Sequence, residues 1–219
     1  MKKTLLIAAA ALISATAFAQ TGVVSSANVV GYIKDVSPAG FHIAGMQFDN
    51  PTNNLSTVFG DSLPKGSKVY TFDSGYTIAE YNDVFVPITG LVTKWNPDTV
   101  LASGEGFWVS LGGTSTNIFS GDVPMDDVIT NSIVEGFQLC TYPYPVDRVV
   151  TNLGLNPSKG DKIYVFDGGY TISEYNDVFV PIVGLVTKWN PVSPIAAGQG
   201  FWYSTTNATD WVVTRPFTP

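Results

Sequence analysis

Few residues in this chain have side chains suited to catalysis. It contains one histidine, His42, and one cysteine, Cys140, among 219 residues. A nucleophilic triad needs a base beside its nucleophile, and zinc sites are built mainly from imidazole and thiolate ligands. With one histidine and one cysteine, the chain has too few such side chains for either kind of site. His42 stands in GFHIAGM, and a related stretch, GFQLCTY, has Gln138 at the equivalent position. We therefore interpret His42 as an ordinary strand residue.

Carboxylates are the remaining candidates for catalysis. The tetrapeptide EYND occurs at 80–83 and again at 174–177. A glycosidase requires two carboxyl groups that face each other across one cleft, but active sites are seldom present twice in a small chain. Glu105 is replaced by Gln199 at the equivalent position, and an amide cannot act as a general acid. The sequence predicts a protein that is not an enzyme, with no catalytic residue, metal or cofactor.

Side chains suited to ligand binding are more numerous than those suited to catalysis, because aromatic and amide residues recur in both copies. Exposed rings can stack on sugars beside Asn and Asp, whereas buried rings would form the core of a domain without disulfides. Both interpretations stay open for Trp95 and Trp189, while the core is favoured for Trp108 and Trp202. The predicted binding residues are Tyr81, Asn82, Asp83, Trp95, Tyr175, Asn176, Asp177 and Trp189. Oxygen side chains in these segments also leave calcium binding open.

These residues lie in a unit that the chain contains twice. KGSKVYTFDSGYTIAEYNDVFVPITGLVTKWNP at 65–97 matches KGDKIYVFDGGYTISEYNDVFVPIVGLVTKWNP at 159–191, and LASGEGFWVS at 101–110 matches IAAGQGFWYS at 195–204. Two units are too few for a solenoid. We therefore expect two homologous domains related by a pseudo-twofold axis. Burial does not require identical polar residues, so either gene conversion or a surface that both copies present explains the identity.

Strand patterns fill each unit. Residues Val69–Asp73 and Tyr76–Tyr81 alternate around Ser74-Gly75, and a short loop with glycine between alternating runs is typical of a hairpin. The run VFVPITGLVTKW that follows is rich in β-branched residues and is broken by a proline and a glycine. This run predicts two short strands with a bend.

The fold class follows from these patterns. The expected helical turns are Asn53–Phe59 in the first unit and Val149–Leu153 in the second. The sequence predicts an all-β protein of two β-sandwich or barrel-like domains in tandem, each with about six strands and one short helical turn. We place the two repeats at residues 29–126 and 127–219.

The N-terminal residues MKKTLLIAAAALISATAFAQ have a basic start, an apolar stretch and a small-x-small site before Gln20. This pattern predicts a secretory signal peptide at 1–19, followed by a flexible segment at 20–28. No later stretch is apolar enough over a sufficient length to cross a bilayer. We expect export to the cell surface, the medium or the periplasm. One cysteine allows no internal disulfide, so the core alone must hold the fold.

Charge is scarce and negative. The formal net charge is −7, and charged residues make up 13% of the chain, against roughly a quarter in ordinary soluble domains. Nucleic acid is an unsuitable partner, because binding to phosphates needs clustered Lys and Arg. Few charged side chains are left to protect exposed sheet edges from pairing with other chains.

The order of short motifs carries a resemblance. The motifs are VVGYIK at 29–34, GFHIAG at 40–45, NLSTVFG at 54–60, KVYTF at 68–72, GEGFWV at 104–109, SGDVP at 120–124 and WVVTRPF at 211–217. In this order, and in two copies, they resemble uncharacterised secreted bacterial proteins with two tandem β-rich repeats. The match covers nearly all of the chain after the leader. The resemblance implies export and a duplicated all-β fold, and it implies no catalytic residues.

Two functions are consistent with these observations. The first is a secreted, non-enzymatic structural or surface protein, such as a subunit of a self-assembling fibre or matrix. Self-association would use the repeated EYND-KWNP surface, or the strand Val29–Lys34 added to a neighbour's sheet edge; that strand would otherwise complete its own domain. The alternative is a carbohydrate-binding module that uses the aromatic and amide residues named above.

Overall fold

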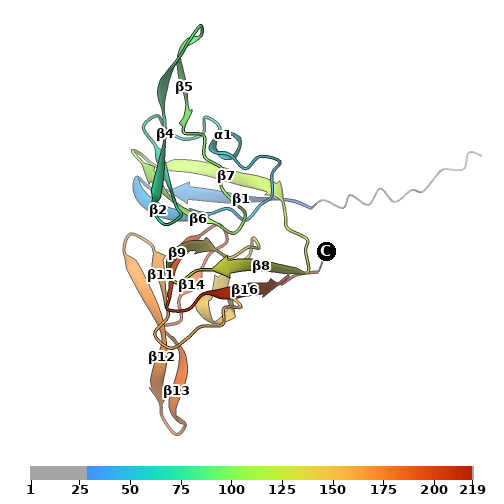
Figure 1. The fold of residues 1–219 in the computed structure, drawn as a ribbon, viewed down its shortest axis with the longest axis vertical. Helices are drawn as coiled ribbons and strands as arrows, with labels where there is room; N and C mark the ends of the chain where they lie inside the picture. Colours follow the sequence, from blue (N-terminus) through green and yellow to red (C-terminus); the bar gives the residue numbers. More distant parts are fainter. Residues whose placement is uncertain (1–28, 219) are drawn as a thin grey trace, which may run out of the picture.

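The computed structural model describes residues 29–218, so the predicted leader 1–19 and segment 20–28 lie outside the described residues. The described chain forms two halves with the same order of main strands (Figure 1). The first half contains β1 (Val30–Ser37), β2 (Gly40–Gly45), α1 (Leu55–Val58), β3 (Lys68–Phe72), β4 (Tyr76–Val86), β5 (Gly90–Asn96), β6 (Gly106–Leu111) and β7 (Ser115–Asp122). The second contains β8 (Val128–Ile133), β9 (Gly136–Thr141), β10 (Arg148–Val149), η1 (Val150–Asn152), β11 (Lys162–Phe166), β12 (Tyr170–Val180), β13 (Gly184–Asn190), β14 (Pro194–Ile195), β15 (Gly200–Thr205) and β16 (Thr209–Thr214).

Each half combines a five-stranded sheet with a two-stranded sheet, and the paired strands are antiparallel. The five-stranded orders are β2-β6-β3-β4-β5 and β9-β15-β11-β12-β13, and the two-stranded sheets are β1-β7 and β8-β16. The second half adds the short pair β10-β14. The all-β class and the duplication are therefore confirmed. The boundary that we expected between residues 126 and 127 falls in the connection between β7 and β8.

The two expected helical turns are present and short. In the first half, the Asn54 side chain accepts a hydrogen bond from the backbone N–H of Thr57 at 3.1 Å, which caps the free N–H groups at the start of α1. The equivalent turn of the second half, η1, is a 3₁₀ helix without a side-chain cap. Neither turn is long enough to carry a site of its own. No helix within residues 29–218 has the length and apolar character needed to cross a membrane.

Each five-stranded sheet buries one face in the core of its own half. The first core contains Leu55 from α1, Phe107 from β6 and Phe119 from β7, all at most 3% exposed. The second core contains Phe201 from β15 and Trp211 from β16, which are exposed to 0% and 1%. These apolar interiors agree with the expectation that a chain without disulfides relies on its core. Because the side chains of a strand alternate, the opposite face of each sheet carries a different set of residues.

The halves meet along a seam in which equivalent groups bond across the pseudo-twofold axis. The N–H of Gly45 donates to the carbonyl of Gly198 at 2.8 Å, and the N–H of Thr141 donates to the carbonyl of Gly104 at 3.1 Å. The buried Gln47 side chain adds an asymmetric link, because its amide donates to the carbonyl of Tyr142 at 2.7 Å. The seam therefore fixes one half against the other through backbone contacts.

Small residues at the seam allow this close approach. A Cβ on Gly106 would lie 2.6 Å from the carbonyl oxygen of Cys140, and a Cβ on Gly200 would lie 2.5 Å from that of Ala44. These two glycines are the second glycine of the repeated Gly-x-Gly-Phe-Trp motif. The motif therefore serves the contact between the halves.

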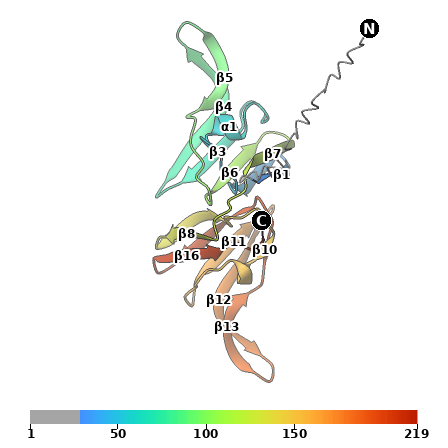
Figure 2. The ribbon, with the colours of Figure 1, turned by 90° about the vertical axis from the view of Figure 1, so that its right-hand side faces the viewer.

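One part of the strand prediction was wrong. We expected a strand that ends at Tyr81, followed by a separate short strand before a bend; instead β4 runs without a break from Tyr76 to Val86. Its partner β5 pairs with it from Glu80 onward, whereas β3 pairs with it only up to Glu80. Beyond that point β4 and β5 form a free two-stranded ribbon. Figures 1 and 2 show this ribbon and its equivalent, β12–β13, extending to opposite ends of the molecule.

The strand near the N-terminus is paired within its own chain. Val30 to Ser37 of β1 lie opposite Asp122 to Ser115 of β7 over their full length. The described structure thus shows the intramolecular alternative for Val29–Lys34. β7 occupies one edge of this strand in a sheet of two strands.

Candidate functional site

The residues that we predicted as a binding site lie together at the base of each ribbon. In the first half they occupy β4 and β5, where Tyr81 lies opposite Trp95 and Asn82 lies opposite Lys94. The second half repeats the same register in β12 and β13. The structure therefore brings each set of four residues together, one set in each half of the molecule.

Both tryptophans of this set are buried. Trp95 is 2% exposed and packs on Phe59 and Tyr81, and its indole N–H donates to the carbonyl of Gly60 at 3.3 Å. Trp189 is 5% exposed and packs on the partly buried Tyr175. These rings present no free face to a sugar, because they close the core at the foot of each ribbon. Of the two interpretations that the sequence left open, burial is the one the structure shows.

The aspartates of the set are held by side chains that lie outside it. Asp83 accepts hydrogen bonds from Lys65 and from the hydroxyl of Thr93, the latter at 2.7 Å. Asp177 accepts from Lys159 at 2.6 Å and from Thr187 at 2.7 Å. The lysine hydrogen bond, followed by that of the threonine, holds the pKa of each carboxyl below its ordinary value. These contacts link both strands of a ribbon to the loop before β3 or β11, which gives the repeated polar residues a structural role.

The tips of the ribbons are apolar and exposed. We call the ribbons beyond Glu80 and Glu174 the arms, and their ends at 84–92 and 178–186 the arm tips. In the first tip, Phe85 is 70% exposed, Ile88 107% and Leu91 71%; their equivalents in the second tip are exposed to 70%, 106% and 70%. Phe85 lies directly opposite Leu91 across the ribbon. Neither tip contains a charged residue.

The isoleucine at the turn has an unfavourable backbone conformation. Ile88 has φ of 80° and Ile182 has φ of 75°. A β-branched residue is rarely found in this left-handed region, which costs about 1–3 kcal/mol. Asparagine or glycine would fit the turn with less strain and better solubility. In both copies this isoleucine is strained and fully exposed. A smaller polar residue would therefore serve folding at least as well.

A second apolar surface lies in the middle of the molecule. The outer faces of the two five-stranded sheets carry the same large side chains at equivalent positions. These are Phe41, Tyr70, Phe72, Tyr76, Ile78 and Trp108 in the first half, and Phe137, Tyr164, Phe166, Tyr170, Ile172 and Trp202 in the second. Ring contacts cross between the halves: Phe72 packs on Trp202 and Phe166 packs on Trp108, each at 5.0 Å.

Two pockets open on this surface, one on each half. The first aromatic pocket has a volume of about 450 Å³ and the second about 500 Å³. Phe41, Tyr70, Ile78 and Trp108 line the first, and their four equivalents line the second. Tyr76 borders both pockets, so they lie side by side. All lining side chains are aromatic or aliphatic, with Tyr hydroxyl and Trp N–H groups as their polar atoms.

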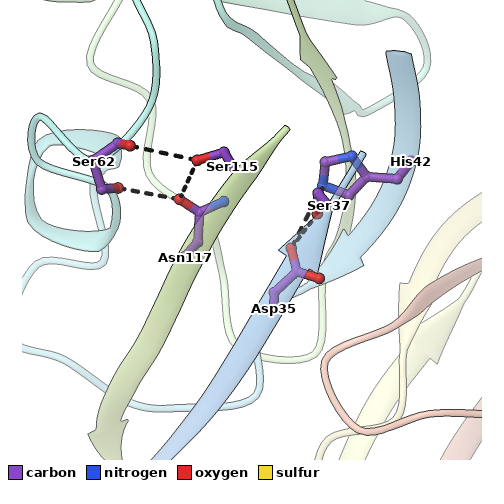
Figure 3. A network of polar contacts seen from close by, with 6 residues as sticks. All are labelled: Asp35, Ser37, His42, Ser62, Ser115 and Asn117. Atoms are coloured by element: carbon purple, nitrogen blue, oxygen red, sulfur yellow. Dashed lines mark hydrogen bonds and ion pairs between the residues drawn. The ribbon is translucent and has the colours of Figure 1, made fainter. Parts of the chain in front are cut away.

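The only histidine of the sequence takes part in a partly buried hydrogen-bond network. Ser37 lies between Asp35 and His42, at 2.5 Å from the carboxylate and 2.9 Å from Nε2 (Figure 3). In a nucleophilic triad the carboxylate holds the other ring nitrogen, Nδ1, whereas here Asp35 lies 3.7 Å from Nε2. Burial lowers the pKa of His42 despite the nearby carboxylate. Ser37 is 2% exposed, and Asp35, Ser37 and His42 line one side of a pocket of about 320 Å³. Figure 3 also shows Ser62, Ser115 and Asn117, which connect the loop after α1 to β7.

Two other candidates have structural partners. Glu105 accepts a hydrogen bond from the N–H of Ala102 at 3.0 Å, and Gln199 accepts the same bond from Ala196 at 3.0 Å. The amide of Gln199 thus makes the same hydrogen bond as the carboxylate of Glu105. Cys140 is 2% exposed, and burial raises the pKa of its thiol to about 12. Within residues 29–218, no three or more His, Cys, Asp or Glu side chains are grouped as metal ligands.

Comparison with known proteins gives no relative for this chain: no family model, no curated sequence and no solved structure matches it. Sequence reasoning missed both apolar surfaces. For the arm tips the available signal was that Phe85, Ile88 and Leu91 recur unchanged; for the pockets it was the large side chain on every second residue of β3 and at the start of β4.

Proposed function

We propose that this protein is an exported, non-enzymatic structural subunit that assembles with copies of itself through its two arms. The observation that carries the proposal is the exposure of Phe85, Ile88 and Leu91, and of their equivalents, at two tips that point away from the body of the molecule. Large apolar residues gathered at a projecting tip are a mark of a protein interface. The duplication supplies two such tips, which is the minimum that an extended assembly requires.

The construction of the arms supports this function. The ion pair and threonine hydrogen bond at Asp83 and Asp177 hold each ribbon at its base, and buried Trp95 and Trp189 anchor it to the core. An interface element binds more tightly when it is held in its bound conformation beforehand. The segment that the two repeats share almost letter for letter therefore comprises a rigid stem and an apolar tip. A requirement for two equivalent arms explains the identity of both parts.

The experiment is to express the full chain with its own leader, purify the exported form and measure its mass by sedimentation velocity over a wide concentration range. N-terminal sequencing of the same material should begin at Gln20 if the leader is cleaved as predicted. The wild type should form large species. The double substitution Ile88→Asp with Ile182→Asp should be monomeric at the concentrations at which the wild type assembles. It should not lose thermal stability, because both side chains are fully exposed.

A matched control is Val100→Asp with Val192→Asp. These valines are 59% and 52% exposed and lie outside the arms and the aromatic pockets. The control adds the same charge to apolar surface elsewhere and should assemble as the wild type does. A wild type that stays monomeric at its highest soluble concentration would overturn the proposed function.

Carbohydrate binding remains the second candidate function. The aromatic surface is a better site for a sugar than the residues that we first predicted. Tyr76 and Tyr170 are 54% and 51% exposed and could offer ring faces to a sugar. The binding test is a shift in tryptophan fluorescence on titration with polysaccharide, because Trp108 and Trp202 line the pockets. A monomeric protein that shows such a shift would favour this function.

A further inference from the structure

We infer that the arm tip of one copy docks into an aromatic pocket of another copy. This inference rests on the proposed function and specifies its interface. The molecule has two equivalent tips and two equivalent pockets. Each repeat contains one arm tip and most of the side chains of one pocket. Both surfaces are apolar, and the described structure leaves both uncovered.

The contact must form between molecules. Ile78 lines the first aromatic pocket and Ile88 is at the arm tip, and both lie on or directly after the continuous strand β4. Ten residues of extended chain separate them by about 33 Å. Because β4 and β5 hold each other in register up to Val86 and Gly90, the tip cannot fold back onto its own pocket. Figure 2 shows each arm pointing away from the centre of the molecule.

Charge favours this pairing over other contacts. The chain carries a formal net charge of −7, so two copies repel each other in most orientations. Neither the tips nor the pocket linings contain a charged residue, and contact between them brings no like charges together at the interface. Added salt should therefore strengthen assembly, because it screens the repulsion between the bodies and leaves the apolar contact in place.

The pocket chemistry also selects an apolar side chain over a sugar. A glycan site needs several hydrogen-bonding groups to compensate for the buried hydroxyls, and these linings supply only Tyr hydroxyls and Trp N–H groups. An isoleucine with the adjoining phenylalanine needs no such partners. Ring faces and edges such as those of Tyr76 and Trp108 can enclose it by dispersion contacts alone.

The area of one contact indicates how the assembly behaves. The three apolar side chains of a tip expose on the order of 400 Å², so that tip and pocket together would bury on the order of 800 Å². A stable pairwise interface buries about 1,200–2,000 Å². One docked tip is therefore weak. A copy that donates two tips and accepts two makes up to four contacts, and such heterologous contacts give closed rings or open filaments and sheets according to the rotation between neighbours, with growth cooperative in either case.

The test uses two variants of the full exported chain. The tip variant carries Ile88→Asp and Ile182→Asp and keeps both pockets. The pocket variant carries Ile78→Lys and Ile172→Lys and keeps both tips; these isoleucines are 50% and 46% exposed, so the sheet can accept the change. Circular dichroism and thermal unfolding establish that each variant is folded. Each variant alone should need a concentration on the order of 100-fold higher than the wild type to assemble.

Mixing the two variants is the decisive measurement. One supplies tips and the other supplies pockets, so an equimolar mixture should regain large species in which the two alternate, with a shift in the fluorescence of Trp108 and Trp202. If the pocket variant assembles alone as the wild type does, tips pair with tips: the inference fails and the proposed function stands. If both folded variants stay inert when mixed, the tip-to-pocket contact is overturned. If wild type and variants are all monomeric, the proposed function itself fails.

Discussion

A single methyl group at the seam provides a sharp test of how the halves are joined. Gly106 of β6 lies against the backbone of Cys140, and a Cβ there would stand 2.6 Å from its carbonyl oxygen, 3.0 Å from its carbonyl carbon and 3.1 Å from its nitrogen. All three atoms belong to a paired strand, β9, so none can rotate away. The substitution Gly106→Ala must therefore push the two sheets apart.

The size of the effect follows from these distances. Raising a 2.6 Å contact to the ordinary 3.4 Å requires a displacement of about 0.8 Å. A gap of this size forfeits a quarter to a half of the dispersion energy of the atoms that it separates, and overpacking typically costs about 1–3 kcal/mol. We expect Gly106→Ala to lower the free energy of unfolding by about 2–3 kcal/mol, at the upper end of that range, because the buried contacts around Ile43 and Leu139 open as well.

The assay is urea unfolding followed by tryptophan fluorescence, with Gly112→Ala as the control. Gly112 has open space around its Cβ position and no positive φ, so alanine there should be neutral or should stabilise by about 0.4–1 kcal/mol. The double variant Gly106→Ala with Gly200→Ala should cost less than the two single effects added, since the first substitution already opens the shared seam. If Gly106→Ala and Gly112→Ala differ by less than about 0.5 kcal/mol, the reasoning is refuted.

Three further predictions concern the arm, the thiol and the core. The hydrogen bond from Lys65, followed by that from Thr93, lowers the pKa of Asp83, so its contribution is present above the ordinary aspartate pKa of 3.8 and is lost as the pH falls through the lowered value. The protection factors of the arm amides, which are exchange rates corrected for the intrinsic pH dependence of the chemistry, should fall only in that acidic range, and a fall between pH 5 and 8 would contradict this. Cys140, with its thiol pKa of about 12, should react with a disulfide reagent only after denaturant is added, and rapid labelling of the native protein would disprove its burial. Trp95→Ala should lower the free energy of unfolding by about 3–5 kcal/mol, measured by thermal unfolding; an unaffected midpoint would mean that the ring is not part of the core.

Several features of the fold could be predicted from local patterns. The expected hairpin turn at Ser74-Gly75 joins β3 to β4, although the positive φ falls on Ser74, at 57°, and not on the glycine. The turn of helix after Asn54 also agrees with the sequence. Each of these depends on a few neighbouring residues, or on the comparison of one repeat with the other. The length of β4 could not be predicted in the same way, because Pro87 suggested a break in the strand and in fact lies at the turn beyond it.

The predicted binding residues lie together in the arm, but the structure does not leave all of their side chains free to meet a ligand. EYND and KWNP do mark the arm, yet Trp95 is buried and Asp83 is engaged by Lys65 and Thr93. The residues that face solvent are the apolar ones in between, such as Ile88. Hydrophobicity alone assigns isoleucine to a core. The arm tip lies beyond the point at which β3 stops pairing with β4, so no other part of the described chain packs on it. Only the tertiary structure shows this.

By itself, the amino-acid sequence determined the β class, the duplication and the small set of reactive side chains, because alternation, glycine turns and internal identity are local or can be counted. Tertiary structure alone decided which aromatic faces are buried and which remain open. Trp95 and Trp108 are alike in type and in their strand surroundings, but one closes a core and the other lines a pocket. The difference arises because a strand buries whichever face the rest of the chain packs against, and that packing partner lies far away in the sequence.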